Sequence, residues 1–141
     1  MARNKNVTHL QNVAIFSTCT TRELSQIERA ADEEQVEAGN AIVSEGEEGR
    51  KFYLILQGEA TVSRDGKKLT KLGPGQYFGE LALLDRAPRN ATVTAATPMT
   101  LLVLGDREFS AVLDQWPGVA HKLLMQMAAR LRAADDRAVT H

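Results

Sequence analysis

The pattern of hydrophobic and polar positions divides the chain into helical ends and a strand-rich middle. Near the start, Leu24, Ile27 and Ala31 recur at helical intervals and share one apolar face. Thr20 and Glu23 have the spacing of a capping box, which predicts where this helix begins. From about residue 34 to residue 104 the pattern changes to short apolar or alternating runs separated by turn residues.

Short strands are predicted throughout this middle region. They cover residues 34–38, 41–45, 51–57, 59–65, 67–72, 76–79, 90–95 and 99–104. Glycine-containing turns fall between them, and Asp65-Gly66 is typical of a two-residue hairpin. Strands at this spacing favour an eight-stranded antiparallel β-roll or jelly roll. The predicted fold class is therefore mainly β, with an N-terminal helix and two C-terminal helices.

Two helices are predicted after the strands. Asp106 is the expected N-cap of the first helix, and Pro117 is expected to end or bend it. The second helix covers about residues 119–137. Its apolar seam, spaced by four and three residues, consists of Ala120, Leu124, Met127, Leu131 and Ala134. The seam has two interpretations that the pattern leaves open: packing on the roll, or a contact with a second copy or a cavity.

Length and composition fit a soluble globular domain better than a nucleic-acid-binding or membrane protein. The 141 residues suit a single domain, divided into an N-terminal helical segment (about 7–33), a β-roll (34–104) and C-terminal helices (105–137). Seventeen basic and 18 acidic residues leave a net charge of −1, without the basic surplus of a nucleic-acid binder. No apolar run is long enough for a membrane span. A single cysteine, Cys19, favours a cytoplasmic location.

Arg89 is the residue that most needs an explanation. In the strand after it, Ala91, Val93 and Ala95 share one face, and the same alternation points Arg89 inward. An inward guanidinium keeps its charge and needs a negative partner. Glu80 is one candidate, which would make a structural ion pair. A ligand phosphate, which arginine grips with two hydrogen bonds, is the other.

The segment before Arg89 supplies features that suit a phosphate. Gly79 permits a sharp turn, and residues 80–84 can form one helical turn whose first N–H groups are unpaired. Glu80 offers acceptors for a sugar hydroxyl. Together these features predict a pocket for a ribose phosphate, while an ion pair closing a corner of the roll remains the alternative.

The stretch FGELALLDRAPRNATVTA, residues 78–95, resembles the phosphate-binding cassette of cyclic-nucleotide-binding domains. This family includes regulatory subunits of cAMP-dependent protein kinase, cyclic-nucleotide-gated channels and bacterial catabolite-activator-type regulators. The similarity extends over nearly the whole chain, through NVAIFSTCTTRELSQI, GNAIVSEGEEGRKFYLILQGEATV and REFSAVLDQWPGVAHKLLMQMAARL. The cassette itself corresponds to residues 78–92.

The resemblance implies roles for individual residues. Glu80 would accept a hydrogen bond from the ribose 2′-hydroxyl, and Arg89 would pair with the cyclic phosphate. Backbone N–H groups near Leu81, Ala82 and Ala91 would complete the phosphate cradle. The full implied nucleotide-binding set is Val62, Leu69, Thr70, Phe78, Gly79, Glu80, Leu81, Ala82, Arg89, Asn90 and Ala91, with Val62, Leu69 and Thr70 on the purine side.

The implied ligand is cAMP ahead of cGMP. Asn90 stands where cAMP sites often have a small residue and cGMP-preferring sites a threonine. In catabolite-activator-like proteins a hydroxyl of the last helix reaches the adenine, but the corresponding stretch here is Ala133, Ala134 and Asp135. A weakly discriminating site would share these features.

The expected function is that of a non-enzymatic cyclic-nucleotide receptor, with no cofactor and no metal. No nucleophile, base and orienting acid occur in a recognisable arrangement. The C-terminal helices would pass the signal to an unidentified effector protein, with a homodimer through the last helix as a further prediction. Two alternatives are a degenerate roll that serves as an interaction or dimerisation module and the sensory domain of a longer transcription regulator.

Overall fold

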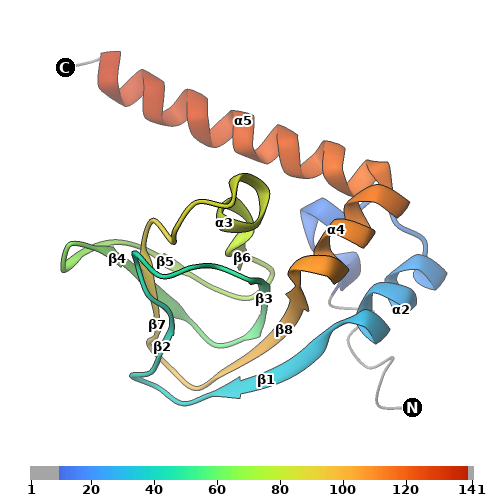
Figure 1. The fold of residues 1–141 in the computed structure, drawn as a ribbon, viewed down its shortest axis with the longest axis horizontal. Helices are drawn as coiled ribbons and strands as arrows, with labels where there is room; N and C mark the ends of the chain where they lie inside the picture. The colour runs from blue at the N-terminus through green and yellow to red at the C-terminus, as the bar shows by residue number, and fades with distance from the viewer. Residues whose placement is uncertain (1–9, 140–141) are drawn as a thin grey trace.

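The computed structural model describes residues 10–139 and consists of a β-roll with helices at one end and across its top (Figure 1). Two four-stranded antiparallel sheets have the strand orders β1-β8-β3-β6 and β2-β7-β4-β5. The predicted fold class is thereby confirmed. None of the helices within the described residues has the length and hydrophobicity needed to cross a bilayer.

The strands follow the predicted order, with small differences at their ends. Their bounds are β1 Asp32–Val36, β2 Ala41–Val43, β3 Lys51–Gln57, β4 Ala60–Arg64, β5 Lys67–Leu72, β6 Tyr77–Phe78, β7 Thr92–Ala95 and β8 Met99–Gly105. The short strands β2 and β6 end earlier than expected. Strand β1 begins earlier than predicted because the acidic residues Asp32 and Glu33 pair with Val103 and Leu102 of β8.

The start of the N-terminal helix is fixed by a capping box. A single 3₁₀ turn, η2, covers Ala14–Phe16, and helix α2 covers Thr21–Ala30. The predicted capping box is present: the Glu23 N–H donates to Thr20 Oγ1 at 3.1 Å, and the Thr20 N–H donates to Glu23 Oε1 at 2.8 Å. Two of the otherwise unpaired N–H groups at the helix start are thereby satisfied.

The start of helix α4 corrects one prediction. Helix α4 covers Asp106–Gln115, and its N-cap is Gly105, which makes no side-chain cap. Asp106 is therefore the first helical residue and not the cap, because the chain passes directly from β8 into the helix. Its carboxylate still lies at the positive end of the helix dipole, with Oδ2 3.8 Å from Arg50 Nη1.

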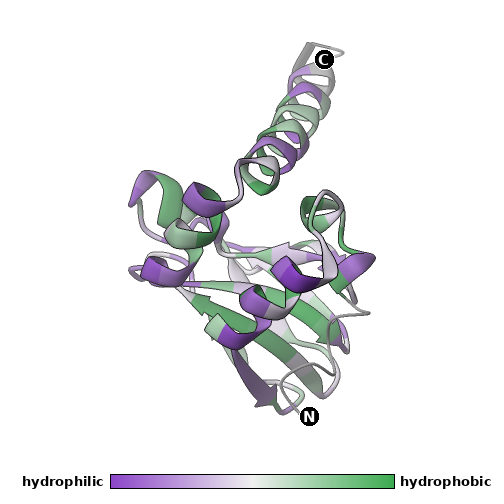
Figure 2. Cartoon of the chain, turned by 90° about the vertical axis from the view of Figure 1, so that its right-hand side faces the viewer, coloured by the Kyte–Doolittle hydropathy of each residue, from purple (hydrophilic) through white to green (hydrophobic). Residues whose placement is uncertain are grey.

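Helix α5 covers Pro117–Val139, so Pro117 begins it rather than preceding it. This is the helix position that proline tolerates best, because its missing N–H has no helical partner there. Val119 and Leu123, in the first turns, are buried in the core. Farther along, Leu124 and Leu131 are exposed. Figure 2 shows hydrophilic and hydrophobic residues alternating along this helix.

The core has two parts, and strand β3 explains the division. Phe52, Leu54 and Leu56 of this strand pack with the helices, whereas Tyr53 and Ile55 face the space between the two sheets. Both faces of β3 are thus buried, which accounts for its nearly continuous apolar sequence. The helices are anchored to the outer face of one sheet, and the space between the sheets opens toward helix α3 (Glu80–Asp85).

Candidate functional site

A cavity of about 450 Å³ lies between helix α3 and the sheet that contains β4, β5 and β7. Ten of the eleven predicted ligand residues line it. Leu69 does not, and its side chain is 52% exposed. Thr70 pairs with Val62 across β4 and β5, and the register shifts just beyond this pair, next to Leu69. Because consecutive strand residues point to opposite faces, Thr70 reaches the cavity with Val62 and Leu69 stays outside it.

Gly79 makes the turn into α3 sterically possible. Its φ is +94°, a left-handed conformation that side-chain-bearing residues rarely adopt. A Cβ atom at this position would lie 2.7 Å from the Lys51 carbonyl oxygen and 2.8 Å from Arg89 Nη1. A side chain at position 79 would therefore collide with the Arg89 guanidinium.

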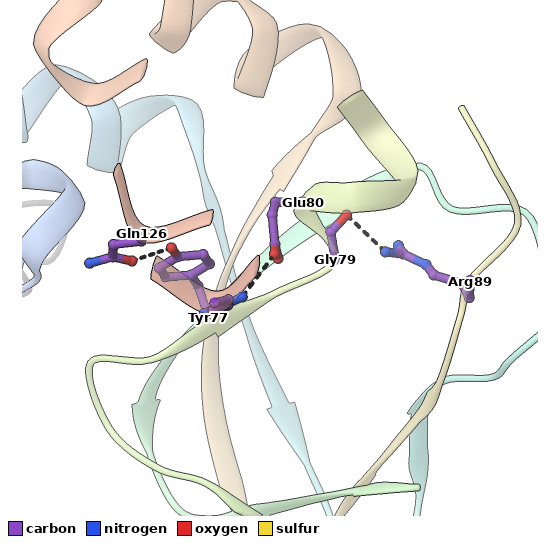
Figure 3. Close-up of polar contacts among 6 residues, drawn as sticks. Tyr77, Gly79, Glu80, Arg89 and Gln126 are labelled. Carbon is purple, nitrogen blue, oxygen red and sulfur yellow. Dashed lines mark hydrogen bonds and ion pairs between the residues drawn. The ribbon is translucent and has the colours of Figure 1, made fainter. Parts of the chain in front are cut away.

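Arg89 is buried and is held by main-chain carbonyl groups. Its Nη1 donates to the Gly79 oxygen at 3.0 Å, as Figure 3 shows. Its Nη2 donates to the Lys51 oxygen at 2.9 Å. No ion pair among the described residues includes Arg89, so the alternative of a direct pair with Glu80 is not what the structure shows. Burial lowers the pKa of Arg89, but a guanidinium stays charged at neutral pH. These bonds use two of its five N–H donors and leave three for an anion.

Gly49, in the turn before β3, closes over the guanidinium from the other side. A Cβ atom there would lie 2.6 Å from Arg89 Cζ and 2.6 Å from Ala82 Cβ. The turn thus packs directly against both the arginine and helix α3. The sequence marked Gly49 only as a turn residue, because its close approach to Arg89 depends on tertiary structure.

Glu80 is the second buried charge of the cavity, and its partner comes from α5. The Glu80 side chain is 5% exposed, and its Oε2 lies 3.3 Å from Nη1 of Arg130. Burial raises the pKa of the Glu80 carboxyl, and the nearby Arg130 opposes part of that rise. Helix α5 therefore takes part in the site through a residue that the sequence did not single out.

Tyr77 provides a further contact between the roll and α5. Its hydroxyl donates a hydrogen bond to Gln126 Oε1, as Figure 3 shows, and its ring centroid lies 5.4 Å from Arg130 Cζ. Burial raises the pKa of the Tyr77 hydroxyl. Gln126 and Arg130 are four residues apart, so they share one side of the helix. The four-residue spacing of these two polar residues is visible in the sequence and could have indicated a polar contact of this helix. Only the apolar seam of the same helix entered the prediction.

The remaining predicted residues take their places along the cassette. Phe78 stacks on Tyr53 with ring centroids 4.9 Å apart, which packs the cassette entrance onto β3. Asn90 is exposed, and its main-chain oxygen accepts a 2.7 Å hydrogen bond from Arg64 Nε. Within the described residues, no three His, Cys, Asp or Glu side chains are grouped so that they could hold a metal ion.

Comparison with known proteins identifies the family. The family model for the cyclic nucleotide-binding domain matches residues 33–115, which is more than half of the chain. The chain belongs to the cyclic nucleotide-binding domain family. This confirms the resemblance seen in the cassette and its flanking segments.

Similar proteins and structures include regulatory subunits and a bacterial activator. A cAMP-dependent protein kinase regulatory subunit of Debaryomyces hansenii is 44% identical over 105 residues, covering 74% of this chain and 23% of that protein. The Catabolite Activator Protein of Thermus thermophilus has a TM-score of 0.83 and 30% identity, covering 89% of this chain and 61% of the other. PKAR CBD2 bound to Sp-2Cl-cAMPS has a TM-score of 0.80 and 28% identity, covering 94% and 91%. The chain spans about a quarter of the length of the curated relatives it matches.

Proposed function

We propose that this domain is a non-enzymatic receptor for a 3′,5′-cyclic purine nucleotide, with cAMP ahead of cGMP. The observation that carries the proposal is the state of Arg89. It is buried at the cavity wall, anchored by two carbonyl oxygens, and keeps three N–H donors without a carboxylate neighbour among the described ion pairs. A buried cation arranged in this way suits an anionic ligand. The names of the kinase relatives favour cAMP as the first ligand to test.

The pose of the ligand follows from the order of groups along the cavity. The cyclic phosphate would meet Arg89 and the N–H groups of Leu81, Ala82 and Ala91. The ribose 2′-hydroxyl would donate to Glu80, which lies at the start of α3. The purine would then extend toward Val62 and Thr70, which lie on the opposite wall.

Helix α5 is the proposed route of the signal. Arg130 and Gln126 connect it to Glu80 and Tyr77 at the edge of the cavity. A ligand that occupies Glu80 acts on one end of this connection. It shifts the position of α5 only if it binds one arrangement of the helix better than another. The effector would then respond to α5, either as another part of a longer chain or as a separate protein.

Thermal unfolding with and without nucleotide tests the proposal directly. At about 100 times its Kd, cAMP should stabilise the domain by roughly 2.7 kcal/mol. Linear 5′-AMP is the matched control, because it carries the same base and sugar without the ring phosphate. Equal stabilisation by cAMP and 5′-AMP, or none by cAMP or cGMP, would contradict a cyclic-nucleotide receptor.

Dimerisation through α5 is a second proposal, favoured by its exposed apolar residues. Leu124 is 62% exposed, Met125 53% and Leu131 72%. Because Leu124 and Leu131 are seven residues apart, they lie along one side of the helix and could pack against a second copy. Sedimentation should show a dimer that Leu131→Ser dissociates, whereas Leu84→Ser on α3 leaves it intact. A monomeric wild-type domain at high concentration would exclude this role.

A further inference from the structure

Strand β4 places a charge where its alternation calls for an apolar residue. Ala60 and Val62 pair with Ala95 and Val93 of β7, and these residues belong to or pack against the core between the two sheets. Arg64 lies two residues beyond Val62, so the alternation carries it to the same side of the sheet. It also lines the cavity, and the residue is exposed. An exposed arginine is thus the next side chain on the face of β4 that carries Val62.

Arg64 is anchored in this position by the cassette. Its Nε donates to the main-chain oxygen of Asn90 at 2.7 Å, which fixes the base of the guanidinium. The terminal nitrogens keep four N–H donors, since a guanidinium carries five in all. No ion pair among the described residues engages them. The chain therefore holds a positioned donor group beside the cavity with its outer donors uncommitted.

The purine ring offers acceptors that match such a donor. N7 is an acceptor in both adenine and guanine, and guanine adds the acceptor O6 beside it. Adenine carries an amino group at that second position, which is a donor and cannot accept from arginine. A guanidinium can therefore make one hydrogen bond to this edge of adenine and two to the same edge of guanine.

We infer that Arg64 is a further ligand-contacting residue, which donates to N7 of a bound purine and additionally to O6 when the base is guanine. The inference rests on the proposed function, since it requires a cyclic nucleotide in the cavity. It also predicts specificity: Arg64 strengthens cGMP binding more than cAMP binding. The ratio of cAMP affinity to cGMP affinity is therefore smaller than it would be with an apolar residue at position 64.

Removing the N7 atom of the ligand and the Arg64 side chain, separately and together, tests this assignment. Dissociation constants are measured for cAMP, 7-deaza-cAMP and cGMP with the wild-type domain, Arg64→Met and the control Lys68→Met. Lys68 is an exposed cation on neighbouring β5 that does not line the cavity. Arg64→Met should weaken cAMP about tenfold, cGMP about thirtyfold or more and 7-deaza-cAMP by less than about twofold. Lys68→Met should leave all three unchanged.

The possible negative results distinguish a failure of the Arg64 contact from a failure of the proposed function. If Arg64→Met weakens cAMP and 7-deaza-cAMP equally, the residue acts through Asn90 or through its general charge, and the N7 contact is excluded. The wild-type comparison of cAMP with 7-deaza-cAMP needs no variant, and equal affinities would overturn the contact even if Arg64→Met fails to fold. If the wild-type domain binds none of the three nucleotides, the proposed function itself fails and the role of Arg64 fails with it.

Discussion

The cavity contains two buried charges, Arg89 at its proposed phosphate end and Glu80 at its proposed ribose end, and they are held in different ways. Arg89 is fixed by carbonyl oxygens of Gly79 and Lys51, which belong to the roll and its cassette. Glu80 is met by the side chain of Arg130, which comes from a helix 50 residues farther along the chain. The Arg130 side chain is 58% exposed, whereas that of Glu80 is 5% exposed.

This difference indicates that the two charges have different roles within one site. Arg89 is buried, is packed against Gly49 and is bonded to two carbonyl oxygens of the main chain, so its side chain has little room to move and the proposed phosphate end is preformed. A half-exposed arginine can leave Glu80 through a change of side-chain conformation or a movement of α5. The phosphate end therefore suits binding, and the ribose end suits communication with the rest of the protein.

Replacing Arg89 with leucine should have the largest effect. With the phosphate left facing an apolar side chain, we expect cAMP affinity to fall by about 100-fold or more, since removing one partner of a buried charged pair costs several kcal/mol. The two carbonyl groups lose their donors as well, so the free domain should lose about 1–3 kcal/mol of unfolding free energy. Calorimetric titration and denaturant unfolding measure the two effects separately.

Arg89→Lys is the matched control for charge. It keeps a cation, but its compact ammonium lacks the planar fork with which a guanidinium reaches separated carbonyl oxygens and an anion, so its affinity should lie between those of Arg89→Leu and the wild type. Unchanged cAMP affinity in Arg89→Leu would show that the preformed end of the cavity is not a phosphate site.

Gly49→Ala should have the next largest effect, because it disturbs the same preformed end without removing a charge. The added methyl group must displace Arg89 or Ala82, since it would lie 2.6 Å from each. Overpacking of this kind costs about 1–3 kcal/mol, and we expect a comparable loss of binding, about tenfold or more. Gly73→Ala is the control, because a Cβ there meets nothing within 4 Å. Equal affinities of the two variants would contradict a rigid phosphate end.

The same two ends show what the sequence can predict. Strand order, the capping box and the inward direction of Arg89 depend on local periodicity and spacing, and the structure reproduces them. The role of Arg130 depends on where α5 crosses the roll, which no local pattern specifies. The partners of Arg89 were likewise not predictable, because carbonyl oxygens are present at every residue and carry no sequence signal.

The β4–β5 hairpin shows what alternation could predict. Leu69 and Thr70 are consecutive in β5, so alternation sends them to opposite faces, and Thr70 lines the cavity while Leu69 does not. Alternation in β4 likewise sends Arg64 to the face of Val62, and Arg64 lines the cavity. The family resemblance placed both Leu69 and Thr70 at the purine, which two consecutive residues of a regular strand cannot satisfy.

Arg130→Met should have a smaller effect, confined to the communicating end. The variant removes the contact with Glu80 and the contact with Tyr77, and we expect cAMP affinity to change by no more than about tenfold. Hydrogen exchange in the second half of α5 should increase in the free domain. Arg132→Met is the control, since Arg132 is exposed on the same helix and does not line the cavity. Equal exchange in both variants would show that Arg130 does not restrain the helix.

Glu80→Gln should have the smallest effect on the free domain, and it should appear as a change in pH dependence. Burial raises the pKa of the Glu80 carboxyl above its ordinary value of 4.5. As pH rises through that value, the unfolded chain releases this proton before the folded chain does, so the contribution of Glu80 to unfolding free energy is complete below it and declines above it. Glutamine has no proton to release, so the wild-type domain should lose stability relative to Glu80→Gln as the pH rises above 4.5. Denaturant unfolding of both proteins across this range measures the difference. A stability difference that stays constant would mean that Arg130 fully compensates the buried carboxylate, and the ribose end would then be as firmly fixed as the phosphate end.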